Sequence, residues 1–131
     1  MRTAAKGNPL DLLGVPYILG AADPACGFDC WELVAYVRRV HYNRRTPLVP
    51  RDFAAACASG LWLRILWPHE AAVVGLSRSR RLPLHHVGVV VQGGVLHAWN
   101  GPHGGTGSVM LTPWERLGEY FQQIEVYECL D

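Results

Sequence analysis

The stretch around Cys30 constrains the fold of this chain most, because it predicts a helix that begins at a cysteine. Past this cysteine, apolar residues recur at the spacing of one buried helical stripe, at Leu33, Val34, Val37 and Val40. Cys30 lies on the same stripe, whereas Arg38 and Arg39 fall outside it. No Pro or Gly interrupts the pattern before about His41. Asp29 is a suitable N-cap, since its carboxylate can accept hydrogen bonds from the free amides of the first turn.

A cysteine at this position has two interpretations. The positive end of a helix dipole favours the thiolate over the thiol, and the thiolate is the nucleophile. A single cysteine is nevertheless more often structural, because free Cys is among the most buried residue types. The catalytic interpretation therefore requires a suitable base elsewhere in the chain.

Length and charge exclude several classes of function. The 131 residues suit one domain with one core, and 50% of them are hydrophobic. The formal net charge of +1 offers no electrostatic footprint for nucleic acid. The arginine-rich segment 78–81 is interpreted as a solvated turn. No apolar run has membrane-spanning length, and residues 1–7 lack the apolar core of a secretory signal, which predicts synthesis in the cytoplasm.

The cysteines predict neither a metal centre nor a disulfide scaffold. Their spacing matches no paired zinc knuckle, and cytoplasmic synthesis predicts reduced thiols at Cys26, Cys30, Cys57 and Cys129. We expect no metal and no cofactor.

Helical patterns come first in the chain and strand patterns follow. Two further helices are expected at 8–14 and 50–58, and strands are expected at 71–76, 85–91, 95–99, 108–111 and 122–128. The Trp-rich segment 61–67 is left unassigned. A capping box at Thr112–Glu115 predicts a late helix that ends near Tyr120. This order indicates an α+β fold with an antiparallel sheet rather than a parallel βαβ fold.

A predicted hairpin brings two histidines together. If its loop is Gln92–Gly93, His97 lies opposite Gly88. His86 then lies on the same face as His97, with the two Cβ atoms roughly 5–8 Å apart. A loop at Gly93–Gly94 keeps both histidines on that face but separates them further.

Cys30, His86 and His97 together are the groups that a cysteine nucleophile needs. His86 would take the thiol proton and later protonate the leaving amine. His97 would hold the His86 ring in the useful tautomer, as the third member of a triad does. Alone, each histidine is better interpreted as a strand residue bonded to backbone; for the three together we favour catalysis. His85 is expected to point to the opposite face, because strand side chains alternate.

The segments GVPYILGAADPACGFDCWELVAYV and HHVGVVVQGGVLHAWNG resemble the NlpC-type cell-wall peptidases, which are papain-like cysteine peptidases of bacterial peptidoglycan. The family signature is a PY-x-x-G segment, a DCSGLV-like motif, and HVGIY before a hairpin that ends in HA. The three motifs occur in the family order over roughly residues 14–100. The resemblance implies a papain-like α+β fold for a single domain, residues 1–131, with N-terminal helices packed on an antiparallel sheet.

The same resemblance implies roles for four residues. Cys30 is the nucleophile, His86 the base and His97 the third polar residue. Tyr17 of the PY segment would lie near the oxyanion, with the Cys30 backbone amide as the other contributor. The implied substrates are peptidoglycan stem peptides, typically cut between γ-D-glutamate and diaminopimelate.

DCWELV and the C-terminal RLGEYFQQIEVYECL resemble the phage-tail branch of that family. This implies an endopeptidase of a phage or prophage tail tip, made in the host cytoplasm and acting from the virion at the host cell wall or periplasm. Its partners would be stem peptides and other tail-tip proteins.

The chain departs from the family pattern at Glu32, where the family usually has Gly, and its hairpin loop is one residue shorter. A negative charge at Glu32 would disfavour the thiolate. Two alternatives stay open: a structural tail-tip or tail-assembly subunit with little or no activity, and a papain-like amidase or acyltransferase with another substrate.

Overall fold

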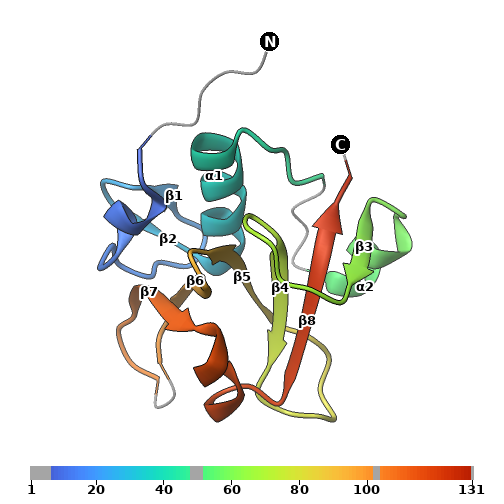
Figure 1. Cartoon of the computed structure of the whole chain (residues 1–131). Helices are drawn as coiled ribbons and strands as arrows, with labels where there is room; N and C mark the ends of the chain where they lie inside the picture. Colours follow the sequence, from blue (N-terminus) through green and yellow to red (C-terminus); the bar gives the residue numbers. More distant parts are fainter. Residues whose placement is uncertain (1–6, 48–51, 102–103, 131) are drawn as a thin grey trace.

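The computed structural model describes residues 7–47, 52–101 and 104–130, and these have an α+β architecture. Six strands form one sheet in the order β3-β8-β4-β5-β6-β7, and every neighbouring pair is antiparallel (Figure 1). Their bounds are Trp62–Ile65 (β3), Val73–Ser77 (β4), His86–Val91 (β5), Gly94–Trp99 (β6), Ser108–Pro113 (β7) and Gln123–Cys129 (β8). The predicted α+β fold with an antiparallel sheet is confirmed.

Helix α1, Cys30–Tyr42, begins at the predicted residue. Asp29 caps it, because its Oδ1 accepts a hydrogen bond of 2.8 Å from the backbone N–H of Glu32. The helix ends where Asn43 adopts a left-handed conformation with φ 54°. A short strand pair, β1 (Ala22–Asp23) and β2 (Gly27–Phe28), leads directly into it.

The smaller elements also largely follow the sequence patterns. The expected helix at 8–14 is a 3₁₀ helix, η1 (Pro9–Leu12), which the side chain of Asn8 caps. The helix expected at 50–58 is α2 (Phe53–Ala58), and residues 50 and 51 lie outside the described part. The unassigned segment 61–67 contains β3, which pairs with β8 at the edge of the sheet.

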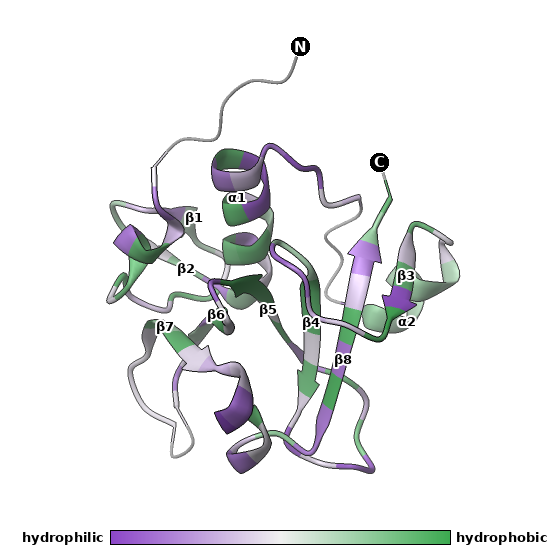
Figure 2. Cartoon of the chain, in the orientation of Figure 1, coloured by the Kyte–Doolittle hydropathy of each residue, from purple (hydrophilic) through white to green (hydrophobic). Residues whose placement is uncertain are grey.

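The sheet separates two apolar layers. On one face, α1 packs against the central strands β5 and β6 through residues such as Leu33 and Val37, which are fully buried. On the other face, the 3₁₀ helix η2 (Trp114–Glu119) contributes the buried Leu117, next to Phe121. Figure 2 shows β5 as a hydrophobic ribbon through the centre, whereas η2 and the connection after α1 are largely hydrophilic. Both layers bury apolar surface against the same strands, which stabilises the sheet from two sides.

The sequence pattern placed Arg38 outside the buried face of α1, but the structure buries this side chain. It is only 1% exposed. Its guanidinium donates to Thr46 Oγ1 at 2.8 Å, to the carbonyl of Arg45 at 2.9 Å and to the carbonyl of Ala71. Because polar partners surround the charged group, its burial is tolerated, and the side chain ties α1 to the segment before β4.

The β5–β6 hairpin has the two-residue loop Gln92–Gly93, since Val91 pairs with Gly94. Both loop residues have positive φ, 47° and 82°, as a tight hairpin turn of this kind requires. The register proposed from the first of the two possible loops is therefore the observed one.

The capping box predicted at Thr112–Glu115 is wrong. Thr112 and Pro113 are the last residues of β7, and η2 begins at Trp114 without a side-chain cap. The reason is tertiary, because the Thr112 hydroxyl bonds to the ring of His97 at 2.8 Å instead. Among the described residues, no helix is long and apolar enough to span a bilayer.

Replacing Gly88 by Ala should destabilise the fold. The added Cβ would collide with Val95 Cγ1 and lie 3.2 Å from the Cβ of His97. Overpacking of this kind typically costs about 1–3 kcal/mol. Gly118→Ala is the matched control, because nothing lies within 4 Å of its added Cβ. Chemical denaturation of both variants measures the difference, and equal stabilities would contradict this packing.

Candidate active site

Three of the four residues predicted for the site line one cavity. This cavity, of about 210 Å³, is bordered by Tyr17, Cys30, Arg78, His85, His86, Trp99 and Asn100. The fourth predicted residue, His97, lies behind His86 and contacts its ring. The structure therefore brings a thiol, a phenol and an imidazole pair from distant parts of the chain to one place.

Asp29 positions the thiol and the segment that carries the phenol. The carboxylate is fully buried, with Oδ1 on the amide of Glu32 and Oδ2 on the amide of Gly20, both at 2.8 Å. Cys30 is therefore the first residue of a capped helix, where the helix dipole favours negative charge. Tyr17 precedes the Gly20 loop and forms a β-bridge to Phe28. One buried carboxylate thus fixes both sides of the cavity.

A chain of hydrogen bonds runs from His86 into the sheet. His86 Nε2 lies 2.7 Å from His97 Nδ1, and His97 Nε2 lies 2.8 Å from Thr112 Oγ1. The sequence predicted the histidine pair but not Thr112. Thr112 could have been found from the pairing of β6 with β7. In that pairing His97 lies opposite Met110, and Thr112 is the diagonal neighbour on the same face.

This chain can set the tautomer of His86. When His97 donates its Nε2–H to Thr112 Oγ1, its Nδ1 is an acceptor. His86 then donates its Nε2–H to that nitrogen, and its Nδ1 keeps a lone pair. That lone pair is the group that a general base needs to take a thiol proton.

Both imidazoles are held neutral at neutral pH. Burial, with smaller contributions from His97 and His85, lowers the pKa of His86 well below its ordinary value of 6.5. Burial also lowers the pKa of His97 to about 4. The resting site therefore offers a basic nitrogen and not an imidazolium.

Aromatic rings enclose the histidine pair. Phe121 stacks on His86 with ring centroids 5.7 Å apart, and Trp99 stacks on His97 at 5.4 Å. These contacts fix the ring planes and remove the imidazoles from water, which is the cause of their low pKa values. No sequence pattern pointed to Phe121, because it follows η2 and reaches the site only through the tertiary fold.

His85 does not point away from the site as strand alternation predicted. β5 begins at His86, so His85 precedes the strand and the alternation rule does not apply to it. Its side chain is exposed and lines the same cavity as Cys30. Glu32, which lies in the first turn of α1, is half-buried and is not among the lining residues.

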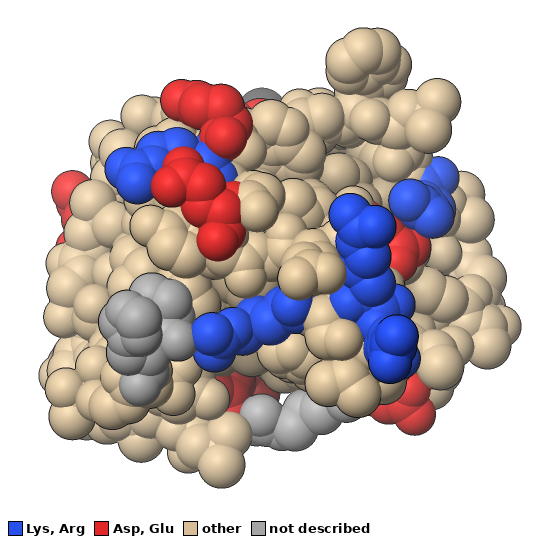
Figure 3. Space-filling model, turned by 90° about the horizontal axis from the view of Figure 1, so that it is seen from below, with Lys and Arg blue, Asp and Glu red and all other residues tan. Residues whose placement is uncertain are grey.

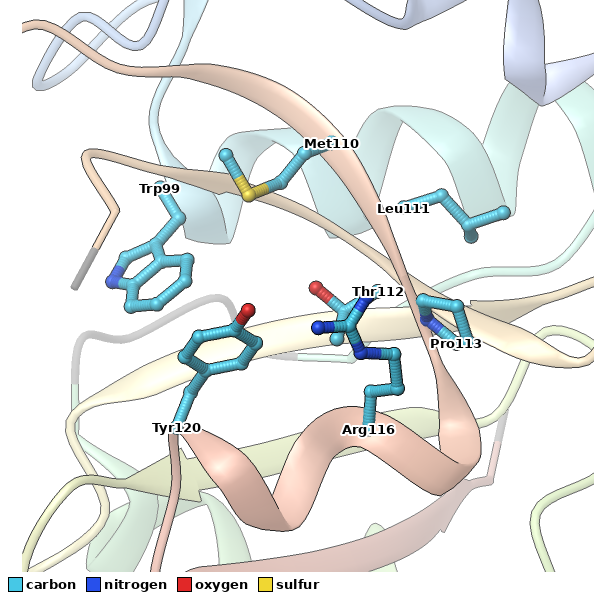
Figure 4. A pocket seen from close by; sticks show the side chains of 7 residues that line it. All are labelled: Trp99, Met110, Leu111, Thr112, Pro113, Arg116 and Tyr120. Carbon is cyan, nitrogen blue, oxygen red and sulfur yellow. The ribbon is translucent and has the colours of Figure 1, made fainter.

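A second cavity, of about 220 Å³, lies beside the far end of the histidine chain. Figure 4 shows the Tyr120 hydroxyl and the Arg116 guanidinium directed toward Thr112, with Trp99 and Met110 at one side. Arg116 also pairs with Glu119 at 3.0 Å. Trp99 borders both cavities, so its indole lies between the thiol site and this second space.

The described residues hold no group of three or more His, Cys, Asp or Glu side chains placed to bind a metal ion. Cys26 and Cys57 are exposed thiols, whereas Cys30 and Cys129 are buried.

Solved structures with the same fold exist. The NlpC/p60 domain of the peptidoglycan hydrolase SagA matches 90% of this chain and 91% of its own length, with a TM-score of 0.55 and 21% identity. A Staphylococcus aureus protein of the NLP/P60 family, described as similar to a lipoprotein, matches 94% of this chain but 39% of its own length, with a TM-score of 0.57 and 17% identity. No family model matches the chain, and no curated protein matches it significantly in sequence.

These likenesses identify the fold as the papain-like NlpC/p60 type. The prediction of that fold from the three sequence motifs is confirmed. At such low identity a shared fold does not establish a shared reaction, so function has to be argued from the residues of the cavity.

The buried histidines should make stability depend on pH. The pKa of His97 is 6.5 ordinarily and about 4 in the fold, so between these pH values the unfolded chain binds more protons. The free energy of unfolding is therefore not reduced by His97 above pH 6.5. As the pH falls toward 4, this free energy decreases by about 3 kcal/mol because of His97 alone. His86 acts in the same direction.

Denaturant unfolding of the wild type and of His97→Gln at several pH values between 4 and 7 measures this loss. The variant should lose less stability over the interval, because it lacks one of the two titrating rings. Parallel pH dependences for the two proteins would show that His97 is not held neutral by burial.

Proposed function

We propose that the protein is a cysteine peptidase that hydrolyses amide bonds of peptidoglycan stem peptides, such as γ-D-glutamyl-diaminopimelate. One observation carries the proposal: Cys30, at a helix start, shares a cavity with His86, whose far nitrogen is 2.7 Å from His97. The fold supports it, since a protein with the same fold is named a peptidoglycan hydrolase.

The reaction follows from the groups in the cavity. His86 takes the Cys30 proton, and the sulfur attacks the scissile carbonyl to form a tetrahedral oxyanion. Tyr17 and the Cys30 backbone amide would donate hydrogen bonds to that oxyanion. The C–N bond breaks as His86 returns the proton to the leaving amine, which leaves a thioester. Water, deprotonated by His86, hydrolyses the thioester and regenerates the thiol.

Cys30→Ala should abolish hydrolysis and leave the fold intact. Loss of a nucleophile typically removes several powers of ten in rate. Cys26→Ala and Cys57→Ala are the controls, because both thiols are free and exposed. A zymogram on purified cell wall, with mass analysis of the released stem peptides, measures activity and the bond that is cut. If Cys30→Ala stays active while a control variant is inactive, the nucleophile is assigned wrongly.

We further propose that the enzyme acts from a phage or prophage tail tip. DCWELV, with Trp31 directly after the nucleophile, supports this placement. An exposed apolar site after β3 also supports it, since Leu66 and Trp67 are 89% and 80% exposed and suit contact with another protein. Immunodetection in purified virions tests this placement. If the infected host expresses the protein but the purified virions lack it, the placement is contradicted.

The same exposed residues favour a second candidate, a structural tail-tip subunit with little activity. Glu32 is the residue that distinguishes the two candidates, because a negative charge in the first turn raises the pKa of a nearby thiol. A structural subunit that does not use the thiol as a nucleophile can carry a glutamate at this position without any effect on assembly.

Glu32→Gly should raise the alkylation rate of Cys30 by iodoacetamide at neutral pH and raise hydrolysis by the isolated protein. Glu32→Gln separates the charge from the size of the side chain. Both are made in a Cys26→Ala, Cys57→Ala background, so that the exposed thiols do not contribute. Identical rate profiles against pH for all three proteins would show that Glu32 does not restrain the thiol.

A further inference from the structure

One charged side chain of the cavity has no part in the reaction described above. Arg78 lines the cavity together with Cys30, and its uncharged polar neighbours there include Asn100. Among the described residues that border this space, none is acidic. The cavity therefore favours a ligand that carries negative charge close to the thiol.

The turn that carries Arg78 is fixed from two sides. Ser77, the buried last residue of β4, donates its hydroxyl to the carbonyl of Ser79 at 3.0 Å and accepts from the Ser79 amide. The side-chain amide of Gln123, at the start of β8, donates to the carbonyls of Ser79 and Leu82 at 2.5 and 2.6 Å. These bonds hold the backbone around Arg78, so the guanidinium is presented from an ordered turn and not from a free loop.

The surface around this turn is basic. Figure 3 views the molecule from the side on which the β4–β5 turn lies in Figure 1, and arginine side chains extend across the middle and right of that face. Arg80 and Arg81 lie in the same turn and, like Arg78, are exposed, but they do not border the cavity. Of the three arginines, Arg78 alone lines the space that holds the thiol.

We propose that Arg78 binds a free carboxylate that lies next to the scissile amide, and that it selects γ-linked glutamate with a free α-carboxylate over the same residue with that carboxylate amidated. The proposal rests on the proposed function and names its substrate class. In a γ-linked glutamate the side-chain carboxyl forms the amide, so the α-carboxylate stays free a few bonds from the scissile carbonyl.

The chemistry of the guanidinium fits this ligand. Arginine stays charged and binds carboxylate through two parallel N–H···O bonds, which gives direction as well as attraction. An amide in place of the carboxylate loses the charge and presents N–H groups to N–H donors. A charged hydrogen bond of this kind corresponds to about 10- to 100-fold in affinity or in kcat/KM.

The test compares two synthetic peptides, L-Ala-γ-D-Glu-diaminopimelate and the same peptide with the glutamate α-carboxyl amidated. The wild type should cleave the free acid at least about 10-fold faster in kcat/KM. Arg78→Gln should lower kcat/KM for the acid by about 10- to 100-fold and leave the amidated peptide unchanged. Arg78→Lys should recover part of the preference, because lysine keeps the charge without the fork. Arg80→Gln, from the same turn, should behave as the wild type.

Binding to the Cys30→Ala protein separates this proposal from the proposed function. Both peptides are titrated into Cys30→Ala and into the double variant Cys30→Ala, Arg78→Gln by calorimetry. Tighter binding of the acid, lost in the double variant, supports the role of Arg78 even if the wild type cleaves neither peptide. Equal affinities for acid and amide, or an equal loss for both on removal of Arg78, would overturn it.

Discussion

The buried carboxylate of Asp29 is the interaction on which the site depends most. A carboxylate removed from water is costly unless hydrogen-bond donors surround it, and here the amides of Glu32 and Gly20 each supply one. The first of these bonds fixes the start of α1, and the second fixes the loop that follows Tyr17. Because one side chain satisfies both donors, the start of α1 and the loop that follows Tyr17 are held to each other. Asp29, the residue directly before the proposed nucleophile, therefore contributes to the preorganisation of the cavity.

The apolar core that stabilises the sheet also determines the protonation of the histidine pair. His86 and His97 lie among Trp99 and Phe121, in the apolar layer opposite α1. That layer lowers the pKa of both rings and makes each remaining hydrogen bond in the chain to Thr112 more important. A neutral third residue stabilises an imidazolium less than a carboxylate would. The burial that keeps His86 available as a base at neutral pH therefore also disfavours its protonated state.

Local patterns predicted a large part of this arrangement, and tertiary contacts account for the rest. The start of α1, its Asp29 cap and the Gln92–Gly93 register follow from spacing and turn chemistry, so the contact of His86 with His97 was predictable. The capping box at Thr112 satisfied every local rule but failed, because His97 competes for the same hydroxyl. Arg38 was misplaced for a related reason: its partners are polar groups of the connection after α1 and the carbonyl of Ala71 before β4, which only the folded chain brings near. Periodicity detects which side chains are apolar, but not which polar groups a distant segment will satisfy.

The residues at the rim of the cavity are held differently from those at its centre. The helix start and the paired strands are held by the core, and proteins at 17–21% identity share that framework. Arg78 and His85 belong instead to the connection between β4 and β5, whose backbone is held by Ser77, by Gln123 and through the amide of His85. Because these bonds reach backbone atoms of the connection, its side chains can be exchanged without disturbing the thiol and the imidazole. Specificity can therefore change in this turn while the position of the thiol and imidazole stays fixed by Asp29 and the hairpin.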